Sequence, residues 1–332
     1  MNYKQRDKIK RYLRDRIINF IPYKPWRKAL RYAIWEMGIA HFLNYLYYEY
    51  MYHEKAAKGE RLSFENELSV AAIVKNETPY IQEWIEYHLL AGVEKFYIYN
   101  NESEDNIEEV LKPYIKEGIV VYKNFPGKAV QCYAYIDAIK RYRNKTRWLA
   151  IIDADEFIVP LKHEKITDFL RDFESYSQVL MGWMLYGSSG HKVKQNGLII
   201  EDYKYNVSLD YITNSKVVVN PRAVRGVLNP HWCFVNGLAV DENKQVFEVY
   251  PYTNKYFKPI SKTAICVNHY YCKSWEEYLN KINKGWADGN AFDRDKSLFD
   301  YYDKNEVFDS TMEKYIEPVK AAIKKRRNNN EL

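Results

Sequence analysis

The strongest constraint on the fold is a regular alternation of strand-like and helix-like segments between residues 68 and 155. Short apolar runs predict strands at 68–74, 96–99 and 119–122, and a fourth strand that ends on Asp153 and Asp155. Apolar residues at helical spacing predict the intervening helices at 81–89, 107–114 and 128–143. Such alternation predicts a parallel sheet with right-handed crossovers, whose ligands bind at the carboxyl ends of the strands.

The fourth strand ends in a pair of carboxylates. If this stretch is pleated, Asp153 and Asp155 point to the same side while Ala154 points to the other. Carboxylates without a nearby Cys or His suit Mg²⁺ or Mn²⁺, which also bind substrate phosphates. The pattern therefore predicts a metal and diphosphate site. Alternatively, these residues and Glu156 cap the segment that follows.

Polar residues also follow the other predicted strands. These residues are Lys75, Asn76 and Glu77 after the first strand, and Asn100, Asn101 and Asp105 after the second. The chain has neither the GxGxxG pattern of dinucleotide-binding folds nor the GxxxxGK[ST] pattern of phosphate-binding loops. If a metal, instead of the backbone amides of a glycine-rich loop, binds the diphosphate, a sugar nucleotide is the expected ligand at this edge of the sheet.

The composition is that of a globular protein, and its charge is unevenly placed. Residues 1–36 carry 11 Lys and Arg against 3 Asp and Glu, a net charge of +8, so the rest of the chain is near −2 and the total of +6 comes from the N-terminus. Its four cysteines lack regular spacing, which predicts reduced, buried thiols. Because the chain has no run of 18 apolar residues and no signal-peptide pattern, we expect a cytoplasmic protein.

The N-terminal segment, residues 1–66, differs from the rest in being basic and rich in aromatic residues. Its pattern predicts helix, interrupted near Pro22 and Pro25. Such a helix can lie on an anionic membrane, which favours a peripheral position on the inner face of the membrane. It can equally pack on the catalytic domain or a partner subunit. We expect no nucleic-acid partner, because no binding motif accompanies the charge.

Beyond these patterns, an ordered series of motifs over residues 68–286 resembles glycosyltransferase family 92, whose members have the GT-A fold and are related to family 2 glycosyltransferases. The motifs are Val74-Lys75-Asn76-Glu77, Glu83-Trp84, Tyr87-His88, Gly92-Val93, Tyr99-Asn100-Asn101, Ser103, Asp105, Gln131, Trp148, Asp153-Ala154-Asp155-Glu156-Phe157, Trp183, Gly187-Ser188-Ser189-Gly190-His191, Glu201, Lys216, His269-Tyr270-Tyr271, Lys273-Ser274, Lys281 and Gly285.

The resemblance implies roles for the residues at the strand ends. Asp155 and Asp153 are the implied metal-binding carboxylates, with Asp153 also near the ribose, and His269 is the implied C-terminal metal ligand. The nucleotide-binding set comprises Lys75, Asn76, Glu77, Asn101, Asp105, Asp153 and Lys273. A capping box predicted at Ser274 to Glu277 begins a helix and positions Lys273 toward the diphosphate.

Glycosyl transfer with inversion requires a base that deprotonates the acceptor hydroxyl. Glu201 is the first candidate, because it falls where the family motif carries a glutamate, and Asp202 is the second. Aromatic rings, hydroxyls and imidazoles bind sugars well. We therefore expect Trp183, Ser189, His191 and His231 on the acceptor side.

The sequence thus predicts an α/β protein of GT-A type with an N-terminal helical extension. The expected segments are 1–66, a transferase domain at 67–290 with a nucleotide-sugar half (67–160) and an acceptor half (161–290), and a basic helical tail at 291–332. The expected activity is metal-dependent, inverting transfer of a hexose, with galactose favoured, from a UDP-sugar to a glycan or lipid-linked saccharide in surface polysaccharide synthesis. The alternatives are a nucleotidyltransferase acting on a sugar phosphate and an inactive glycan-binding or scaffold protein.

Overall fold

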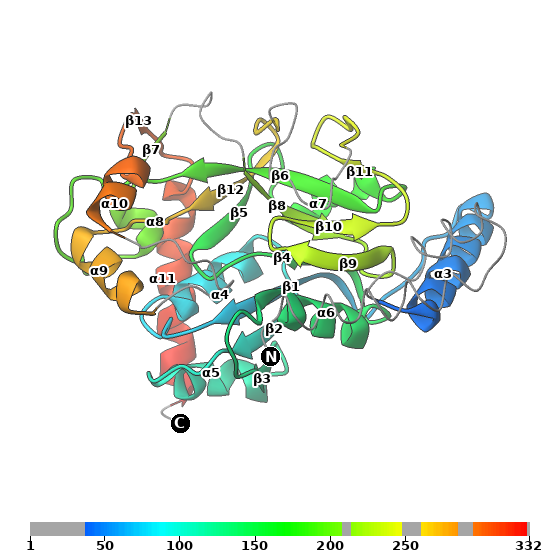
Figure 1. Ribbon diagram of the computed structural model, residues 1–332, viewed down its shortest axis with the longest axis horizontal. Helices are drawn as coiled ribbons and strands as arrows, with labels where there is room; N and C mark the ends of the chain where they lie inside the picture. The colour runs from blue at the N-terminus through cyan, green and yellow to red at the C-terminus, as the bar shows by residue number, and fades with distance from the viewer. Residues whose placement is uncertain (1–36, 208–213, 248–259, 285–294, 331–332) are drawn as a thin grey trace.

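A computed structural model describes residues 37–207, 214–247, 260–284 and 295–330 of the chain. These residues form one α/β body built around a nine-stranded sheet (Figure 1). The helix predicted around Pro22 and Pro25 lies outside the described residues. All four cysteines are buried and free of disulfides, as predicted.

The first half of the sheet is parallel and follows the predicted alternation. Its strands are β1 (Asn66–Val74), β2 (Lys95–Asn100), β3 (Val120–Asn124) and β4 (Thr146–Ile151). They are arranged in the order β3-β2-β1-β4, and each neighbouring pair is parallel. The α/β prediction is therefore confirmed, and the carboxyl ends of these four strands meet at one edge.

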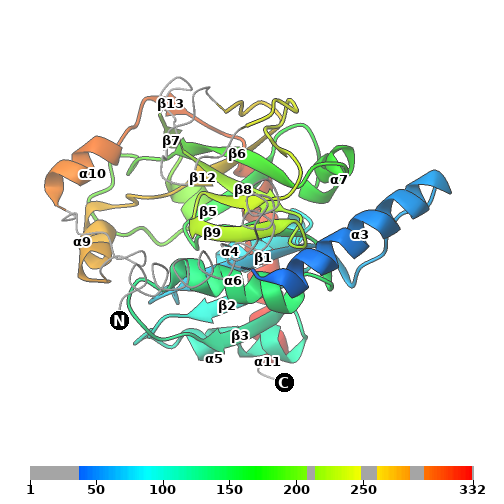
Figure 2. The same cartoon turned by 45° about the vertical axis from the view of Figure 1, so that its right-hand side comes forward.

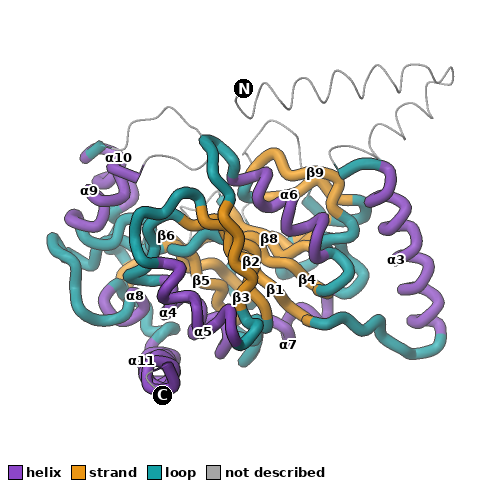
Figure 3. Tube along the Cα trace, turned by 90° about the horizontal axis from the view of Figure 1, so that it is seen from below, coloured by secondary structure: helices purple, strands orange, loops and turns teal. Residues whose placement is uncertain are grey.

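Helices α4 (Ile81–Leu90), α5 (Ile107–Lys116) and α6 (Gln131–Tyr142) connect these strands and cover both faces of the sheet (Figure 3). The alternation of side chains along β1 explains this arrangement. Val70 and Ala72 face the core that contains Trp84 of α4. Ala71, on the other face, joins the core that contains Ala134 of α6. Because both faces are covered, β1 is an almost continuous apolar run.

The second half of the sheet is mixed. Its strands are β5 (Glu156–Pro160), β6 (Gln178–Leu185), β8 (Ser215–Val219), β11 (Ala239–Val240) and β12 (Ile265–His269). β8 lies between β4 and β6 and is antiparallel to both. β12 is parallel to β6 and antiparallel to β5, so it brings its last residue, His269, opposite Glu156. Within the nine-stranded sheet of the described residues, five of the eight strand pairings are parallel, so the central sheet is mostly parallel, as predicted.

Smaller elements complete the second half. They are α7 (Ile166–Leu170), the 3₁₀ turn η1 (Arg171–Phe173), α8 (Ile199–Asp202), the hairpin of β9 (Val224–Asn229) and β10 (Trp232–Val235), and the pair β7 (Tyr205–Asn206) and β13 (Val307–Phe308). Because β13 pairs with β7, the chain beyond residue 300 is tied to the domain rather than forming a detached tail.

Three helices end the chain: α9 (Trp275–Lys284), α10 (Lys296–Tyr302) and α11 (Glu313–Asn330). The predicted capping box begins α9, since Ser274 Oγ accepts the Glu277 N–H and the Glu277 carboxylate accepts the Ser274 N–H. α11 runs along α4 and α8 (Figure 1). Half-buried Arg326 fixes it there through ion pairs with Glu86 and Glu117.

The helix α3 (Ile39–Ala57) projects from the body (Figure 2). It is attached by buried Tyr48, whose ring lies 4.5 Å from the guanidinium of Arg222 and 5.7 Å from that of Arg147. An apolar stripe on α3 remains 46% to 64% exposed and comprises Ile39, Leu43, Leu46, Tyr47 and Tyr50. Among the helices that the structure describes, none has the length and hydropathy needed to cross a membrane.

The structure corrects the local geometry expected for the paired carboxylates. β4 ends at Ile151, and Asp153 and Asp155 lie in the turn that joins β4 to β5 rather than on a pleated strand. The Glu156 N–H donates to the carbonyl oxygen of Asp153 and closes this turn. The turn, and not the alternation of side chains along a strand, therefore determines where the side chains of Asp153 and Asp155 lie.

Candidate active site

The Asp153 carboxylate is bound on both oxygens by the protein. Lys216 Nζ of β8 lies 2.7 Å from Oδ2, while Gln131 Nε2 and the Tyr135 hydroxyl of α6 donate to Oδ1 at 2.9 and 3.1 Å. Burial alone would raise the pKa of this carboxyl, but Lys216 outweighs burial and holds the pKa below its usual value. Asp153 is thus a fixed anion at the exit of β4.

Lys216 also lies 3.3 Å from Glu156 Oε2, and both side chains are fully buried. Burial lowers the pKa of Lys216, but the two neighbouring carboxylates raise it further, so the amine stays charged. Burial raises the pKa of Glu156. Glu156 Oε2 in turn accepts the Asp153 N–H at 2.9 Å. This buried triad locks the turn that carries Asp155.

Asp155 faces His269 and Lys281. Its Oδ1 lies 3.6 Å from His269 Nε2, and its Oδ2 lies 2.6 Å from Lys281 Nζ. Against the effect of burial, Lys281 and His269 hold the pKa of Asp155 well below its usual range. Burial lowers the pKa of His269, which favours a neutral imidazole with a lone pair available.

The pair of Asp155 and His269 has the geometry of two neighbouring metal ligands. A separation of 3.6 Å exceeds a hydrogen bond, yet two atoms at about 2.1 Å from one cation can be this far apart. Among the residues that the structure describes, no group of three His, Cys, Asp or Glu side chains is arranged to hold a metal. The donor set therefore fits a cation that takes its other ligands from diphosphate and water, as Mg²⁺ commonly does.

Two of the residues predicted for the acceptor side lie beside His269. The ring of Trp183, on β6, is 4.4 Å from that of His269 and 4.9 Å from that of His231. Trp183 Nε1 is buried and donates to no acceptor in the described part of the chain. Burial lowers the pKa of His231 to about 3, and its Nδ1 lies 3.1 Å from the carbonyl oxygen of Ser215. Trp183 Nε1 is thus a buried donor without a partner among the described residues, close to His269.

The residues predicted to bind the nucleotide tie together the loops that follow β1, β2 and β3. Glu104 N–H donates to Asn76 Oδ1 at 2.7 Å, and Thr78 N–H donates to Asp105 Oδ2 at 2.9 Å. Asn101 Nδ2 donates to the carbonyl oxygens of Phe125 and Gly127. Asp105 Oδ1 is buried and accepts no hydrogen bond from the described residues.

Lys75 and Glu77 lie in the same half-buried loop, directly after β1. Asn76 between them has φ 53°, in the left-handed region that most residues avoid. The strand ends therefore form one polar platform. Its fixed loop geometry and the available oxygen of Asp105 fit recognition of a base or ribose.

Lys273 lies between this platform and α9. Its backbone has φ 52°, its side chain is buried, and its Nζ is 4.6 Å from the ring of Tyr80. Glu277 anchors the region, because it accepts hydrogen bonds of 2.5 Å from the hydroxyls of Tyr80 and Tyr203. Lys273 also helps Lys281 and His269 to lower the pKa of Asp155. These contacts place Lys273 within electrostatic range of Asp155, and its role in binding a diphosphate stays a prediction.

The remaining predicted residues gather around α8. Glu201 Oε1 lies 2.7 Å from Lys320 of α11, and its Oε2 accepts the Leu198 N–H at 3.4 Å. His191 Nε2 lies 3.2 Å from the carbonyl oxygen of Asp202. Ser189 Oγ accepts the Lys204 N–H, and its own N–H donates to Asn305. In the described part of the chain, these residues make no hydrogen bond, ion pair or ring contact with Trp183, His231 or His269. The predicted acceptor residues therefore fall into two separate groups.

The sequence pattern of glycosyltransferase family 92 matches residues 68–310. The chain belongs to this family. A family 92 protein of Oryza sativa subsp. japonica is 27% identical over 221 residues, which cover 65% of this chain and 35% of that protein. One from Arabidopsis thaliana is 23% identical over 230 residues, which cover 68% and 38%. The chain therefore spans less than two fifths of the length of these relatives.

A galactan beta-1,4-galactosyltransferase of Arabidopsis thaliana is 32% identical over 109 residues, covering 30% of this chain and 21% of that protein. Among solved structures, Staphylococcus aureus TarS in complex with UDP-GlcNAc has 14% identity and a TM-score of 0.33, covering 47% of this chain and 45% of that chain. A likeness this distant does not define a shared fold.

No role was predicted from the sequence for two side chains that bind the Asp153 carboxylate, Lys216 and Tyr135. Lys216 stands alone in the apolar run of residues 215–219, and a lone charge in a buried strand is a usable signal for a buried ion pair. Tyr135, four residues after Gln131 and thus on the same face of α6, carries no signal that distinguishes it from other core tyrosines.

Proposed function

We propose that this family 92 chain is a metal-dependent, inverting glycosyltransferase that moves a hexose from a UDP-sugar to a glycan or lipid-linked saccharide. The observation that carries the proposal is the 3.6 Å gap between Asp155 Oδ1 and His269 Nε2 at the exits of β4 and β12. Around that gap, Lys281 and Lys273 supply positive charge. Two donors and two ammonium groups suit the diphosphate of a nucleotide sugar.

Each part of the site then has a task. Bound Mn²⁺ or Mg²⁺ would neutralise charge that develops on the departing diphosphate. Asp155 and His269 would hold that cation, while Lys216 keeps Asp153 ionised and the turn rigid. Asp153 would act near the ribose rather than as a full metal ligand, because Lys216, Gln131 and Tyr135 already bind its oxygens.

For the base that deprotonates the acceptor hydroxyl, the contacts favour the second candidate over the first. The ion pair with Lys320 lowers the pKa of Glu201, which weakens it as a base. Burial, with Glu201 nearby, raises the pKa of Asp202. Of the two candidates around α8, Asp202 is therefore the better base, and we propose that Trp183 and His231 lie against the sugar.

Galactose is the proposed donor sugar, in the synthesis of a surface polysaccharide. The support is the similarity to galactan beta-1,4-galactosyltransferases, which covers 30% of the chain. Trp183 presents an aromatic ring next to the imidazoles of His231 and His269, and galactose commonly binds aromatic rings through its less polar face.

Titration calorimetry with UDP, UDP-galactose, UDP-glucose and UDP-GlcNAc tests the donor site, with Mn²⁺ and with EDTA. We expect UDP-sugar binding only with the metal, and loss of binding in Asp155→Ala. Asp172→Ala removes an exposed carboxylate of η1 and serves as the matched control. Binding of UTP and a hexose 1-phosphate, but not of UDP-sugars, would indicate a nucleotidyltransferase. Binding of glycans without any nucleotide would indicate a scaffold.

We further propose that α3 holds the enzyme on the inner face of an anionic membrane. Its exposed residues Ile39, Leu43, Leu46, Tyr47 and Tyr50 recur at helical spacing and form one apolar stripe. The 36 residues before the described region carry 11 Lys and Arg against 3 Asp and Glu. Apolar and tyrosine side chains beside a basic segment are typical of helices that lie in the interface of anionic bilayers.

Sedimentation with lipid vesicles tests this attachment. We expect the full chain to bind phosphatidylglycerol vesicles, to bind phosphatidylcholine vesicles weakly, and to lose binding in Leu43→Glu. Leu238→Glu changes a leucine that is 49% exposed outside α3 and should leave binding unchanged. If Leu43→Glu binds vesicles as the wild type does, α3 does not contact the lipid.

A further inference from the structure

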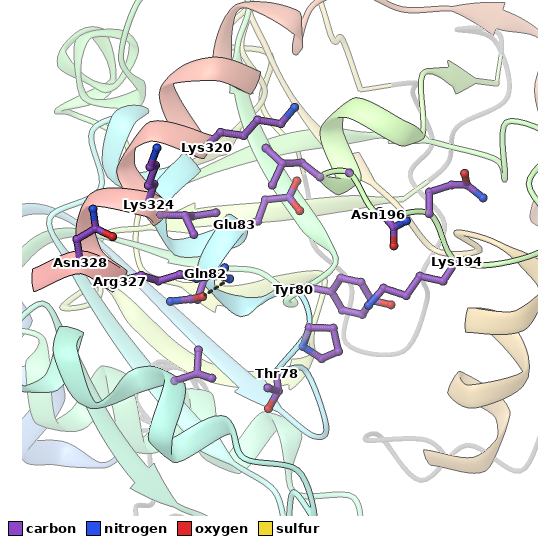
Figure 4. A pocket seen from close by; sticks show the side chains of 16 residues that line it. Thr78, Tyr80, Gln82, Glu83, Lys194, Asn196, Lys320, Lys324, Arg327 and Asn328 are labelled. Atoms are coloured by element: carbon purple, nitrogen blue, oxygen red, sulfur yellow. Dashed lines mark hydrogen bonds between the residues drawn. The ribbon is translucent and has the colours of Figure 1, made fainter. Parts of the chain in front are cut away.

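A cavity of about 750 Å³ opens beside the candidate active site, between the start of α4, the loop at 194–198 and α11. Figure 4 shows Lys324, Arg327 and Asn328 on α11 at one side, and Lys194 and Asn196 at the other. This volume falls within the range of small-molecule sites. The family 92 match ends at residue 310, so α11 adds this wall from outside the matched domain.

The cavity is strongly cationic. Lys194, Lys324 and Arg327 line it, and within the described residues none of the three has a carboxylate partner. Arg327 donates only to the amide oxygen of Gln82 at 3.1 Å, and Lys194 lies 4.8 Å from the ring of Tyr80. Lys320 also lines the cavity, but its charge is paired with Glu201. Three unpaired cations around one hollow attract an anionic ligand.

One acidic residue, Glu83, also lines the cavity, but its carboxylate oxygens accept hydrogen bonds from the backbone of α8. Its carboxylate accepts the N–H groups of Ile199 and Ile200 at 2.8 and 3.0 Å, which ties α4 to α8. Burial raises the pKa of Glu83 to about 7, which reduces its negative charge near neutral pH. The cavity thus keeps a positive balance even with this residue included.

The rest of the lining suits a carbohydrate. Gln82, Asn196 and Asn328 provide amides that donate and accept hydrogen bonds, and Tyr80 provides an aromatic face. Thr78 adds a buried hydroxyl that, in the described part of the chain, makes no hydrogen bond. These are the groups that bind sugar hydroxyls and rings.

Tyr80 connects the cavity to the candidate active site. Lys194 approaches its ring from the cavity, and Lys273 lies 4.6 Å from the same ring. Lys273 in turn lies close enough to Asp155 to affect its ionisation. A ligand that reaches from the site of transfer past Tyr80 would therefore enter the cationic cavity.

We propose that this cavity binds an anionic part of the acceptor, a phosphate or carboxylate carried by the saccharide at a distance from the hydroxyl that receives the sugar. The proposal rests on the transferase function and adds the chemical class of the acceptor. Lys324, Arg327 and Lys194 would bind the anion, and the amides and Tyr80 would bind the neighbouring sugar rings.

Calorimetry on the full chain with Mn²⁺ and saturating UDP tests the proposal, because UDP fills the donor site. The probes are two pairs of saccharides: trigalacturonate against galactotriose for carboxylates, and trehalose 6-phosphate against trehalose for phosphates. We expect at least one anionic saccharide to bind at least tenfold more tightly than its neutral partner. The pair that shows the difference identifies the anion.

The matched variants are Lys324→Glu, inside the cavity, and Lys325→Glu, on the next residue of the same helix and outside the lining. Lys324→Glu should weaken anion binding at least tenfold, and Lys325→Glu less than twofold. Arg327→Gln, which removes charge without reversing it, should weaken binding by an intermediate factor.

Equal weakening by Lys324→Glu and Lys325→Glu, or equal binding of the charged and neutral saccharides, would overturn the proposal. A separate titration of the same protein with UDP and Mn²⁺ measures donor binding, so the two claims can fail separately. Normal UDP binding without anion preference refutes only the acceptor proposal. Absence of UDP binding refutes the transferase function itself.

Discussion

Replacement of Lys216 by Met should cost the protein about 3–5 kcal/mol of its free energy of unfolding. The amine is fully buried, 2.7 Å from Asp153 and 3.3 Å from Glu156. At an effective dielectric constant of about 20, the attraction to Asp153 alone is worth about 6 kcal/mol, and the burial of both ions offsets part of it. Met keeps the length of the side chain, so the loss reports the charge rather than a cavity.

The assay is urea unfolding followed by tryptophan fluorescence, applied to a double-mutant cycle. Lys216→Met leaves the half-buried Asp153 carboxylate without its ammonium partner, with Gln131 and Tyr135 still donating to it. Adding Asp153→Asn removes that charge, so the double variant should recover at least half of the loss. As a control, Lys145→Met removes a lysine from an exposed ion pair with Glu65 and should cost less than about 1 kcal/mol.

Two results would refute this reasoning. A cost below about 1 kcal/mol for Lys216→Met would mean that the buried charges do not depend on one another. Strictly additive effects of Lys216→Met and Asp153→Asn would mean that the two side chains are not coupled.

Three further predictions concern other side chains. Burial raises the pKa of Glu83 from 4.5 to about 7, so the protein should lose about 3 kcal/mol of stability as the pH rises from 4.5 to 7. Urea titrations at several pH values measure this loss, and Glu83→Gln should remove it. Glu277→Gln should destabilise the protein by about 2 kcal/mol, because Glu277 accepts hydrogen bonds from the hydroxyls of Tyr80 and Tyr203. Glu276→Gln, at the exposed neighbouring position, is the control and should change the unfolding free energy by less than about 0.5 kcal/mol in the same assay. Trp183→Phe should raise the KM for substrate about fivefold, because it removes an N–H that donates to no described protein atom. Because Trp183 is buried, the smaller ring should also cost about 1–3 kcal/mol of unfolding free energy, and an unchanged KM would show that substrate does not use this N–H.

The parallel half of the fold could be predicted from the sequence because its signals are local. The apolar run of β1 and the helical spacing of Ile81, Trp84 and Ile85 each depend on a few neighbouring residues. The position of β8 could not be predicted, since its antiparallel pairing with β4 and β6 joins segments far apart in the chain.

For the candidate site, the sequence predicted which residues lie close together, but it did not predict which partner binds each carboxylate. Asp155 lies in the turn after β4 and His269 at the end of β12, and the structure places their side chains 3.6 Å apart. The partners of Asp153 and Glu201 come from distant segments: Lys216 on β8 and Lys320 on α11. A single sequence can indicate that Lys216 needs a buried partner, but it does not identify the partner, and these pairs decide which carboxylates remain available for a metal or an acceptor.

The most direct test of the account is electron paramagnetic resonance of Mn²⁺ bound together with UDP. We predict coupling of the Mn²⁺ spin to ³¹P of the diphosphate and to ¹⁴N of one imidazole, with the nitrogen coupling lost in His269→Gln. The same variant tests the assignment without any knowledge of the acceptor. Absence of Mn²⁺ binding in the presence of UDP, or a nitrogen coupling that persists in His269→Gln, would contradict the proposed site.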